Sequence, residues 1–164
     1  MVEEGVEEPP RRQRVAAYAL LVRDGAILLA RMAPHIAFQG WTLPGGGVDH
    51  GEHPRDTLRR EVFEEAGLHA EAGRLLDVYH HHYTGARPDG LVEDFHALGL
   101  IFEAELLPES EDTEPHVTDV GGSTDLTAWV PIAEVNKLRL SGAAKHAMSL
   151  LDGAARGSEE GETR

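Results

Sequence analysis

The residues best suited to chemistry lie together in one segment, Gly46–Leu68, which reads GGVDHGEHPRDTLRREVFEEAGL. Three of its glutamates, Glu61, Glu64 and Glu65, fall within roughly 100° of arc on a helical wheel. Like charges four positions apart on a helix are unfavourable. Carboxylates crowded in this way suit Mg²⁺ or Mn²⁺, which are hard cations that take oxygen ligands and share them with substrate phosphates.

A helix over residues 54–66 is predicted to carry these glutamates. Pro54 suits the first helical position, and Gly67 suits the position that ends a helix. An apolar stripe beside the carboxylates is formed by Leu58, Val62 and Ala66. Gly45–Gly47 precede the helix in a predicted loop that lets a ligand approach the backbone closely. An ordinary solvated acidic face is the alternative interpretation, and both the apolar stripe and the glycines count against it.

A divalent cation at this place would neutralise phosphate charge, hold a leaving group and lower the pKa of a bound water. That chemistry is in-line hydrolysis of a phosphoanhydride. The carboxylates titrate as a coupled set, so their pattern alone does not identify the general base.

The segment resembles the Nudix box, Gly-x5-Glu-x7-Arg-Glu-(aliphatic)-x-Glu-Glu-x-Gly-(aliphatic). Every fixed position is matched, by Gly46, Glu52, Arg60, Glu61, Val62, Glu64, Glu65, Gly67 and Leu68. The resemblance extends over residues 14–152 and includes WTLPGG at 41–46 and Trp129. It implies an α/β fold, the Nudix-type α/β/α sandwich with a mixed β-sheet. It also implies Mg²⁺-dependent hydrolysis of a nucleoside diphosphate linked to another moiety, which is a nucleoside triphosphate, a dinucleoside polyphosphate or a nucleotide sugar.

The resemblance also implies a role for each residue of the box. The expected metal ligands are the Gly45 carbonyl, Glu61, Glu64 and Glu65. Glu52 and Arg60 are expected to form a supporting pair that fixes the loop on the helix. Glu61 is the expected base. Some relatives take the base from a later loop, where this chain offers Glu114, Asp119 and Asp125, and Asp125 is our choice among them.

Substrate contacts are expected outside the box. Arg31 is a candidate for binding a phosphate, and Trp41 or Tyr83 for stacking on a base. A structural role explains two of them equally well: Arg31 as a surface charge at a strand end, and Trp41 as part of the core. The position after the box that sorts family subgroups holds His82 and Tyr83 without a proline, which favours dinucleoside polyphosphates over ADP-ribose. His80–His82 resemble a metal tract, but alternate residues of a strand face opposite ways, so packed or solvated histidines are the preferred interpretation.

The other elements follow from apolar runs and turn residues. Asp24-Gly25 between two apolar runs predicts a hairpin with a type I′ turn. Strands are predicted at 15–22, 27–30, 41–44, 73–83, 91–107 and 126–130, with the fourth and fifth paired in an antiparallel hairpin around the loop 84–90. Helices are predicted at 132–136 and 141–151, the latter capped by Ser141.

Composition sets broader limits. The 164 residues fit one domain, divided into a disordered leader 1–13, a Nudix domain 14–152 and a flexible tail 153–164. A net charge of −14 argues against nonspecific nucleic-acid binding. No apolar run is long enough to span a membrane, and no signal peptide is recognised, so a cytoplasmic protein is expected.

Two further functional classes fit the sequence less well. A non-catalytic nucleotide or ADP-ribose sensor on the same fold is the alternative, and the complete set of box carboxylates argues against it. The absence of cysteine argues against an isopentenyl diphosphate isomerase. A homodimer is considered, with the strand 91–107 as its interface.

Overall fold

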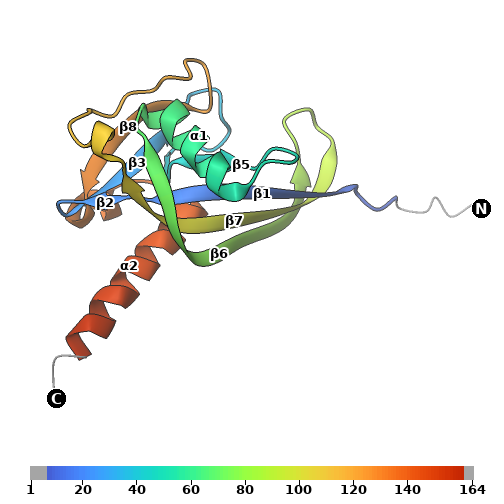
Figure 1. Cartoon of the computed structure of the whole chain (residues 1–164). Helices are drawn as coiled ribbons and strands as arrows, with labels where there is room; N and C mark the ends of the chain where they lie inside the picture. The colour runs from blue at the N-terminus through green and yellow to red at the C-terminus, as the bar shows by residue number, and fades with distance from the viewer. Residues whose placement is uncertain (1–6, 161–164) are drawn as a thin grey trace, which may run out of the picture.

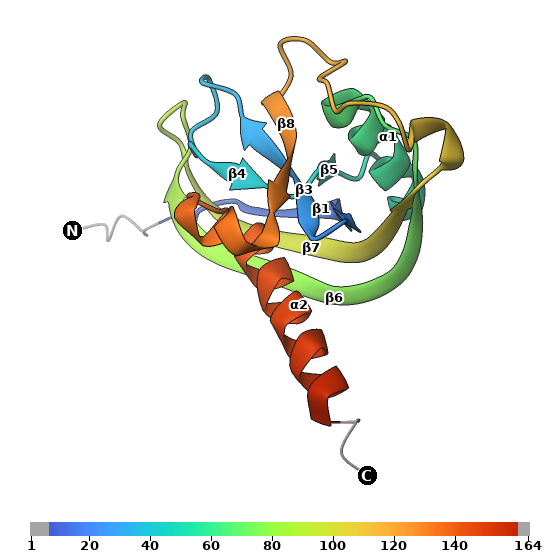
Figure 2. The same cartoon turned by 90° about the vertical axis from the view of Figure 1, so that its left-hand side faces the viewer.

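A computed structural model describes residues 7–160, with side chains as far as Ala154. Two β-sheets lie between helix α1 (Pro54–Ala66) and helix α2 (Gly142–Glu160), and the far end of α2 projects away from the sheets (Figures 1 and 2). This arrangement confirms the expected α/β/α sandwich.

The first sheet is mixed. Its strands, in spatial order, are β5 (Gly45–Gly47), β1 (Arg11–Leu20), β7 (Val92–Leu106) and β6 (Ala70–Ala86). The pair β1 and β7 is parallel, whereas β5 with β1 and β6 with β7 are antiparallel. The antiparallel hairpin of β6 and β7 was predicted; β6 is longer than the predicted 73–83, and β7 lies within the predicted 91–107.

The second sheet is antiparallel and is centred on β3. Its strands are β2 (Val22–Arg23), β3 (Ala26–Met32), β4 (Trp41–Thr42) and β8 (Thr124–Pro131). Asp24 and Gly25 have φ values of 50° and 72°, which confirms the predicted type I′ turn between β2 and β3. The first predicted strand is divided, because β1 ends at Leu20 and β2 belongs to the other sheet.

Short helices complete the fold. The 3-10 helix η1 (Pro108–Ser110) lies in a segment predicted as loop, and η2 (Ile132–Lys137) confirms the predicted brief helix. The Ser141 hydroxyl accepts a hydrogen bond from the Ala144 amide at 3.1 Å, so Ser141 caps α2 as predicted.

Elements of the structure extend into both predicted end segments. β1 begins at Arg11, so residues 11–13 of the predicted leader form a strand paired with β7 from Asp94 onward. The partner is about 80 residues away, which local composition does not reveal. Helix α2 continues to Glu160, through part of the predicted tail. The remaining parts of those predictions, residues 1–6 and 161–164, lie outside the described residues.

The glycines Gly45–Gly47 form strand β5 instead of the predicted loop. Gly45 has φ 146°, and a Cβ atom there would lie 2.2 Å from the Ala17 carbonyl oxygen, so only glycine fits. The glycine run therefore allows β5 to lie closely against β1 while it faces α1.

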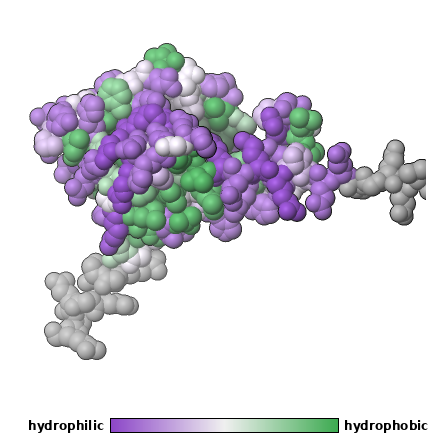
Figure 3. Space-filling view, turned by 45° about the vertical axis from the view of Figure 1, so that its right-hand side comes forward, coloured by the Kyte–Doolittle hydropathy of each residue, from purple (hydrophilic) through white to green (hydrophobic). Residues whose placement is uncertain are grey.

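Strand β7 cannot pair with a second copy of the chain, because β1 and β6 occupy its two edges. A dimer through 91–107 would therefore have to use the face of this strand, and the homodimer stays a prediction. In the view of Figure 3 the surface is largely hydrophilic, with its largest hydrophobic area at the lower centre and smaller ones elsewhere. Within residues 7–160, no helix is long and apolar enough to cross a membrane.

Candidate functional site

Helix α1 has the predicted bounds, and its ends explain why. The His53 side chain accepts a hydrogen bond from the Arg55 amide at 3.2 Å, and Gly67 ends the helix with φ 63°. The stripe residues Leu58, Val62 and Ala66 are fully buried. Burial of that stripe fixes the rotation of the helix and turns the neighbouring glutamates toward β5.

Arg60 bridges three carboxylates of the site. Its Nε and Nη2 atoms each donate to the Glu52 carboxylate at 2.9 Å, and Nη1 donates to Glu61 at 2.8 Å and to Glu64 at 3.3 Å. Thr57 also donates to Glu52, at 2.7 Å. These contacts, those of Arg60 first, lower the pKa of Glu52 to about 2. One arginine thus joins the loop residue Glu52 to two helix glutamates.

The Glu61 carboxylate lies against the backbone of Gly46. A Cβ atom on Gly46 would stand 2.6 Å from Oε1 of Glu61, so a side chain and this carboxylate cannot occupy the space together. Burial raises the pKa of Glu61, and the contact with Arg60 acts against that rise. The position of Glu61 therefore requires the glycine that the box pattern has at 46.

Glu65 is the most buried of the three glutamates, with 6% of its surface exposed. Its Oε2 accepts from the Gly45 amide at 2.8 Å, and its Oε1 accepts from the Thr124 hydroxyl at 2.7 Å. Burial raises the pKa of Glu65 to about 8, although both hydrogen bonds oppose the shift. Glu64 is more exposed and contacts Arg60.

The donor set fits a hard divalent cation. Carboxylate and backbone carbonyl oxygens are the ligands that Mg²⁺ takes, and a cation would keep the buried carboxylates of Glu61 and Glu65 ionised. Between residues 7 and 160, no three acidic or histidine side chains are already grouped as a metal site. Arg60 Nη1 donates to Oε1 of Glu61 and to Oε2 of Glu64, so within the described residues the other oxygen of each carboxylate accepts no hydrogen bond and could bind a cation.

The structure does not bring Asp125 into contact with the helix glutamates. Asp125 lies at a bulge where β8 pairs with β3, and its two carboxylate oxygens accept from Arg31 at 2.8 and 3.1 Å. The predicted alternative base and the predicted phosphate contact are thus bound to each other. Arg31 lowers the pKa of Asp125.

The two predicted stacking residues lie in different surroundings. Trp41 is partly buried and packs against the core cluster on the α2 side, which agrees with the core interpretation. Tyr83 is 43% exposed, and its ring packs edge-on against Phe95 with 5.6 Å between centroids. Tyr83 therefore has an open aromatic surface and Trp41 has less.

The three histidines alternate between faces, as predicted. His80 and His82 both lie beside His96, with ring centroids 5.7 and 5.6 Å away. His81 lies beside Tyr83 instead, at 5.2 Å. The three histidines therefore pack within the hairpin of β6 and β7.

Sequence reasoning missed the residues that hold Glu65 in place. Thr124 donates to its carboxylate, and the Thr127 hydroxyl donates to its backbone carbonyl. Both threonines lie on β8, about 60 positions from Glu65. The two threonines are three positions apart, which would put them on opposite faces of a regular strand. The bulge between them turns both toward Glu65, so no local pattern indicated this partner.

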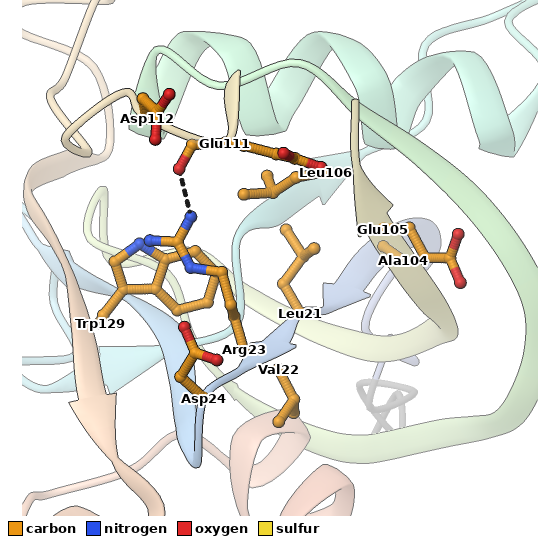
Figure 4. Close-up of a pocket in the computed structure, with 10 residues that line it drawn as sticks. All are labelled: Leu21, Val22, Arg23, Asp24, Ala104, Glu105, Leu106, Glu111, Asp112 and Trp129. Atoms are coloured by element: carbon orange, nitrogen blue, oxygen red, sulfur yellow. Dashed lines mark hydrogen bonds between the residues drawn. The ribbon is translucent and has the colours of Figure 1, made fainter. Parts of the chain in front are cut away.

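A separate hollow of about 650 Å³ lies between the β2–β3 turn, the end of β7 and residues 111–112 (Figure 4). The Arg23 guanidinium lies 4.5 Å from the centre of the Trp129 ring and donates to the Glu111 carbonyl at 2.7 Å. None of the predicted site residues lines this hollow. It is distinct from the carboxylate site on α1.

Comparison with known proteins agrees with this geometry. The family model described as NUDIX domain matches residues 10–151. Nucleoside triphosphatase NudI of Escherichia fergusonii is 38% identical over 100 residues, which cover 56% of this chain and 68% of that protein. NudI of Escherichia coli (strain SE11) is 37% identical over 99 residues, with the same coverage.

Solved structures show the same fold. A MutT NUDIX hydrolase from Burkholderia pseudomallei superposes with a TM-score of 0.61 and 27% identity, over 85% of this chain and 98% of that chain. A MutT protein from Methanosarcina mazei Go1 has a TM-score of 0.66 and 18% identity, over 91% and 98%. This chain belongs to the Nudix family and is a pyrophosphohydrolase of that family.

Proposed function

We propose that the protein hydrolyses a phosphoanhydride bond in a nucleoside diphosphate linked to another moiety, and that nucleoside triphosphates are the first substrates to test. The observation that carries the proposal is that Glu61 and Glu65 meet the Gly45–Gly46 backbone, while Arg60 joins Glu61 to Glu64. The NudI relatives are named nucleoside triphosphatases, which supports this substrate order over the dinucleoside polyphosphates favoured by the His82-Tyr83 position.

Mg²⁺, with Mn²⁺ as a substitute, would be held by Glu61, Glu64, Glu65 and the Gly45 carbonyl. When bound, the cation would neutralise phosphate charge and lower the pKa of a coordinated water. The residues of the chain orient these ligands. Glu52 holds Arg60 through two hydrogen bonds, and Thr124 with the Gly45 amide holds the Glu65 carboxylate.

Glu61 is the proposed general base. Its Oε1 accepts from Arg60, which leaves Oε2 to take a proton from the attacking water. The water oxygen then forms a bond to phosphorus, and the bridging P–O bond breaks with its electron pair on the departing phosphate. We assign this role to Glu61 over Asp125 because both Asp125 oxygens accept from Arg31. Tyr83, which is exposed, is proposed to stack on the base.

The test is a substrate panel with Mg²⁺ and with Mn²⁺, in which phosphate release is followed with and without added pyrophosphatase. The panel contains nucleoside triphosphates, dinucleoside polyphosphates, ADP-ribose and other nucleotide sugars. Glu61→Gln is expected to lower kcat by about 10²-fold or more while the protein stays folded. Glu71→Gln is the matched control, because Glu71 is half-buried and pairs with Arg59, away from the carboxylate site.

Two results would count against this proposal. Full activity of Glu61→Gln would remove Glu61 from the base role. Absence of turnover on every panel member, with either cation, would favour the non-catalytic sensor on the same fold.

A further inference from the structure

Arg14 on β1 lies at the edge of the carboxylate site, on the other side of β5 from α1. A Cβ atom on Gly47 would stand 2.8 Å from Nη2 and 2.9 Å from Nε of Arg14, so the guanidinium rests on the Gly47 backbone. Arg60 donates to the Gly47 carbonyl at 3.3 Å. The guanidinium groups of Arg14 and Arg60 therefore both contact the backbone of Gly47.

The two arginines differ in what they bind. Arg60 is engaged by Glu52, Glu61 and Glu64. Arg14 is exposed and makes no hydrogen bond or ion pair with another residue in the described part of the chain, although the protein carries a net charge of −14. Its neighbour Arg12, by contrast, forms two hydrogen bonds with Glu93, at 2.9 and 3.0 Å. Arg14 thus has donors to offer beside a strongly acidic site.

An anion that approaches Glu61, Glu64 and Glu65 meets three negative charges. Metal ions offset part of that repulsion, and a cation at the mouth of the site offsets more. The guanidinium of arginine presents donors in a fork that matches phosphate oxygens. An ordinary solvated surface arginine is the competing interpretation, and the contact of the guanidinium with the Gly47 backbone distinguishes Arg14 from it.

The same face of the sheet continues from Arg14 to an aromatic pair. Residues two apart on a strand share a face, so Arg12 and Arg14 point the same way, about 7 Å apart along the strand. The Arg12 guanidinium lies 4.4 Å from the centre of the Phe95 ring, and Phe95 packs against Tyr83. The Gly47 backbone, the Arg14 guanidinium and the pair of Phe95 with the exposed Tyr83 therefore follow one another on this face of the sheet.

From this arrangement we propose that Arg14 binds the polyphosphate chain of the substrate on the open side of Gly47. The inference rests on the proposed nucleotide hydrolysis and adds the residue that recognises the phosphates outside the metal ligands. Arg14 acts on binding, not on proton transfer, so its loss changes KM far more than kcat.

The experiment uses the full chain and a base-free probe, inorganic tripolyphosphate, with Mg²⁺ in calorimetry. Arg14→Gln is expected to weaken tripolyphosphate binding about tenfold or more, as loss of a charge-assisted contact implies. Arg14→Lys keeps the charge and is expected to recover part of the affinity. Arg74→Gln is the control, because Arg74 is also exposed and makes no hydrogen bond or ion pair to a residue in 7–160, and it should bind like the wild type.

The outcomes separate this inference from the proposed function. Equal tripolyphosphate affinity in Arg14→Gln and the wild type overturns the role of Arg14, even if nucleotides are hydrolysed. Failure of the folded wild type to bind tripolyphosphate overturns it as well. Tight binding that depends on Arg14, without hydrolysis of any nucleotide on the panel, supports the phosphate site and contradicts the enzyme proposal. Thermal unfolding of each variant verifies that the fold is intact.

Discussion

The substitution Gly46→Ala tests the geometry of the site without removing a functional group. The added Cβ would stand 2.6 Å from Oε1 of Glu61, while ordinary contacts begin at 3.4 Å, so the carboxylate must withdraw by 3.4 − 2.6 = 0.8 Å. Gly46 does not have a positive φ, so the backbone accepts alanine without strain. A displacement of this size in a catalytic group costs up to about 10²-fold in rate.

We therefore expect Gly46→Ala to lower kcat by about 10²-fold. The flexible Glu61 side chain absorbs the clash, so the melting temperature should change little. The assay is steady-state phosphate release on the best nucleotide of the panel, together with thermal unfolding. Gly153→Ala is the matched control, since a Cβ there meets no atom within 4 Å, and its activity should equal that of the wild type. A folded Gly46→Ala protein with wild-type kcat would refute the placement of Glu61.

Two other predictions concern the charged pairs. In the folded protein the pKa of Glu52 is about 2, below its ordinary 4.5. The ionised carboxylate therefore stabilises the fold fully above about pH 4.5, and this contribution is lost as the pH falls toward 2. Glu52→Gln should lower the free energy of unfolding in urea by about 1.5–3 kcal/mol at pH 7, with a smaller difference at pH 3, and equal effects at both pH values would contradict the pairing with Arg60. Asp125→Asn should keep kcat within about threefold of the wild type, whereas a loss of 10²-fold or more would return the base role to Asp125.

The sequence alone determined helix α1 and the type I′ turn, because their signals are local. Pro54, Gly67 and the stripe at helical spacing fix both ends and the buried side of the helix. Asp24-Gly25 supplies the two positive φ values that the turn requires. The box spacing also predicted which glutamates would share one side of α1, since that follows from 3.6 residues per turn.

Tertiary structure decided what those glutamates contact. Thr124 reaches Glu65 from β8, about 60 positions along the chain, and Arg14 reaches Gly47 from β1. Strand pairing over such separations depends on the register of the whole sheet, which no local pattern specifies. For the same reason Arg31 and Asp125, which the sequence offered as two separate functional residues, form one ion pair across β3 and β8. The type of chemistry is thus set by residues close in sequence, while the shape and charge around it are set by residues that only the folded sheets bring together.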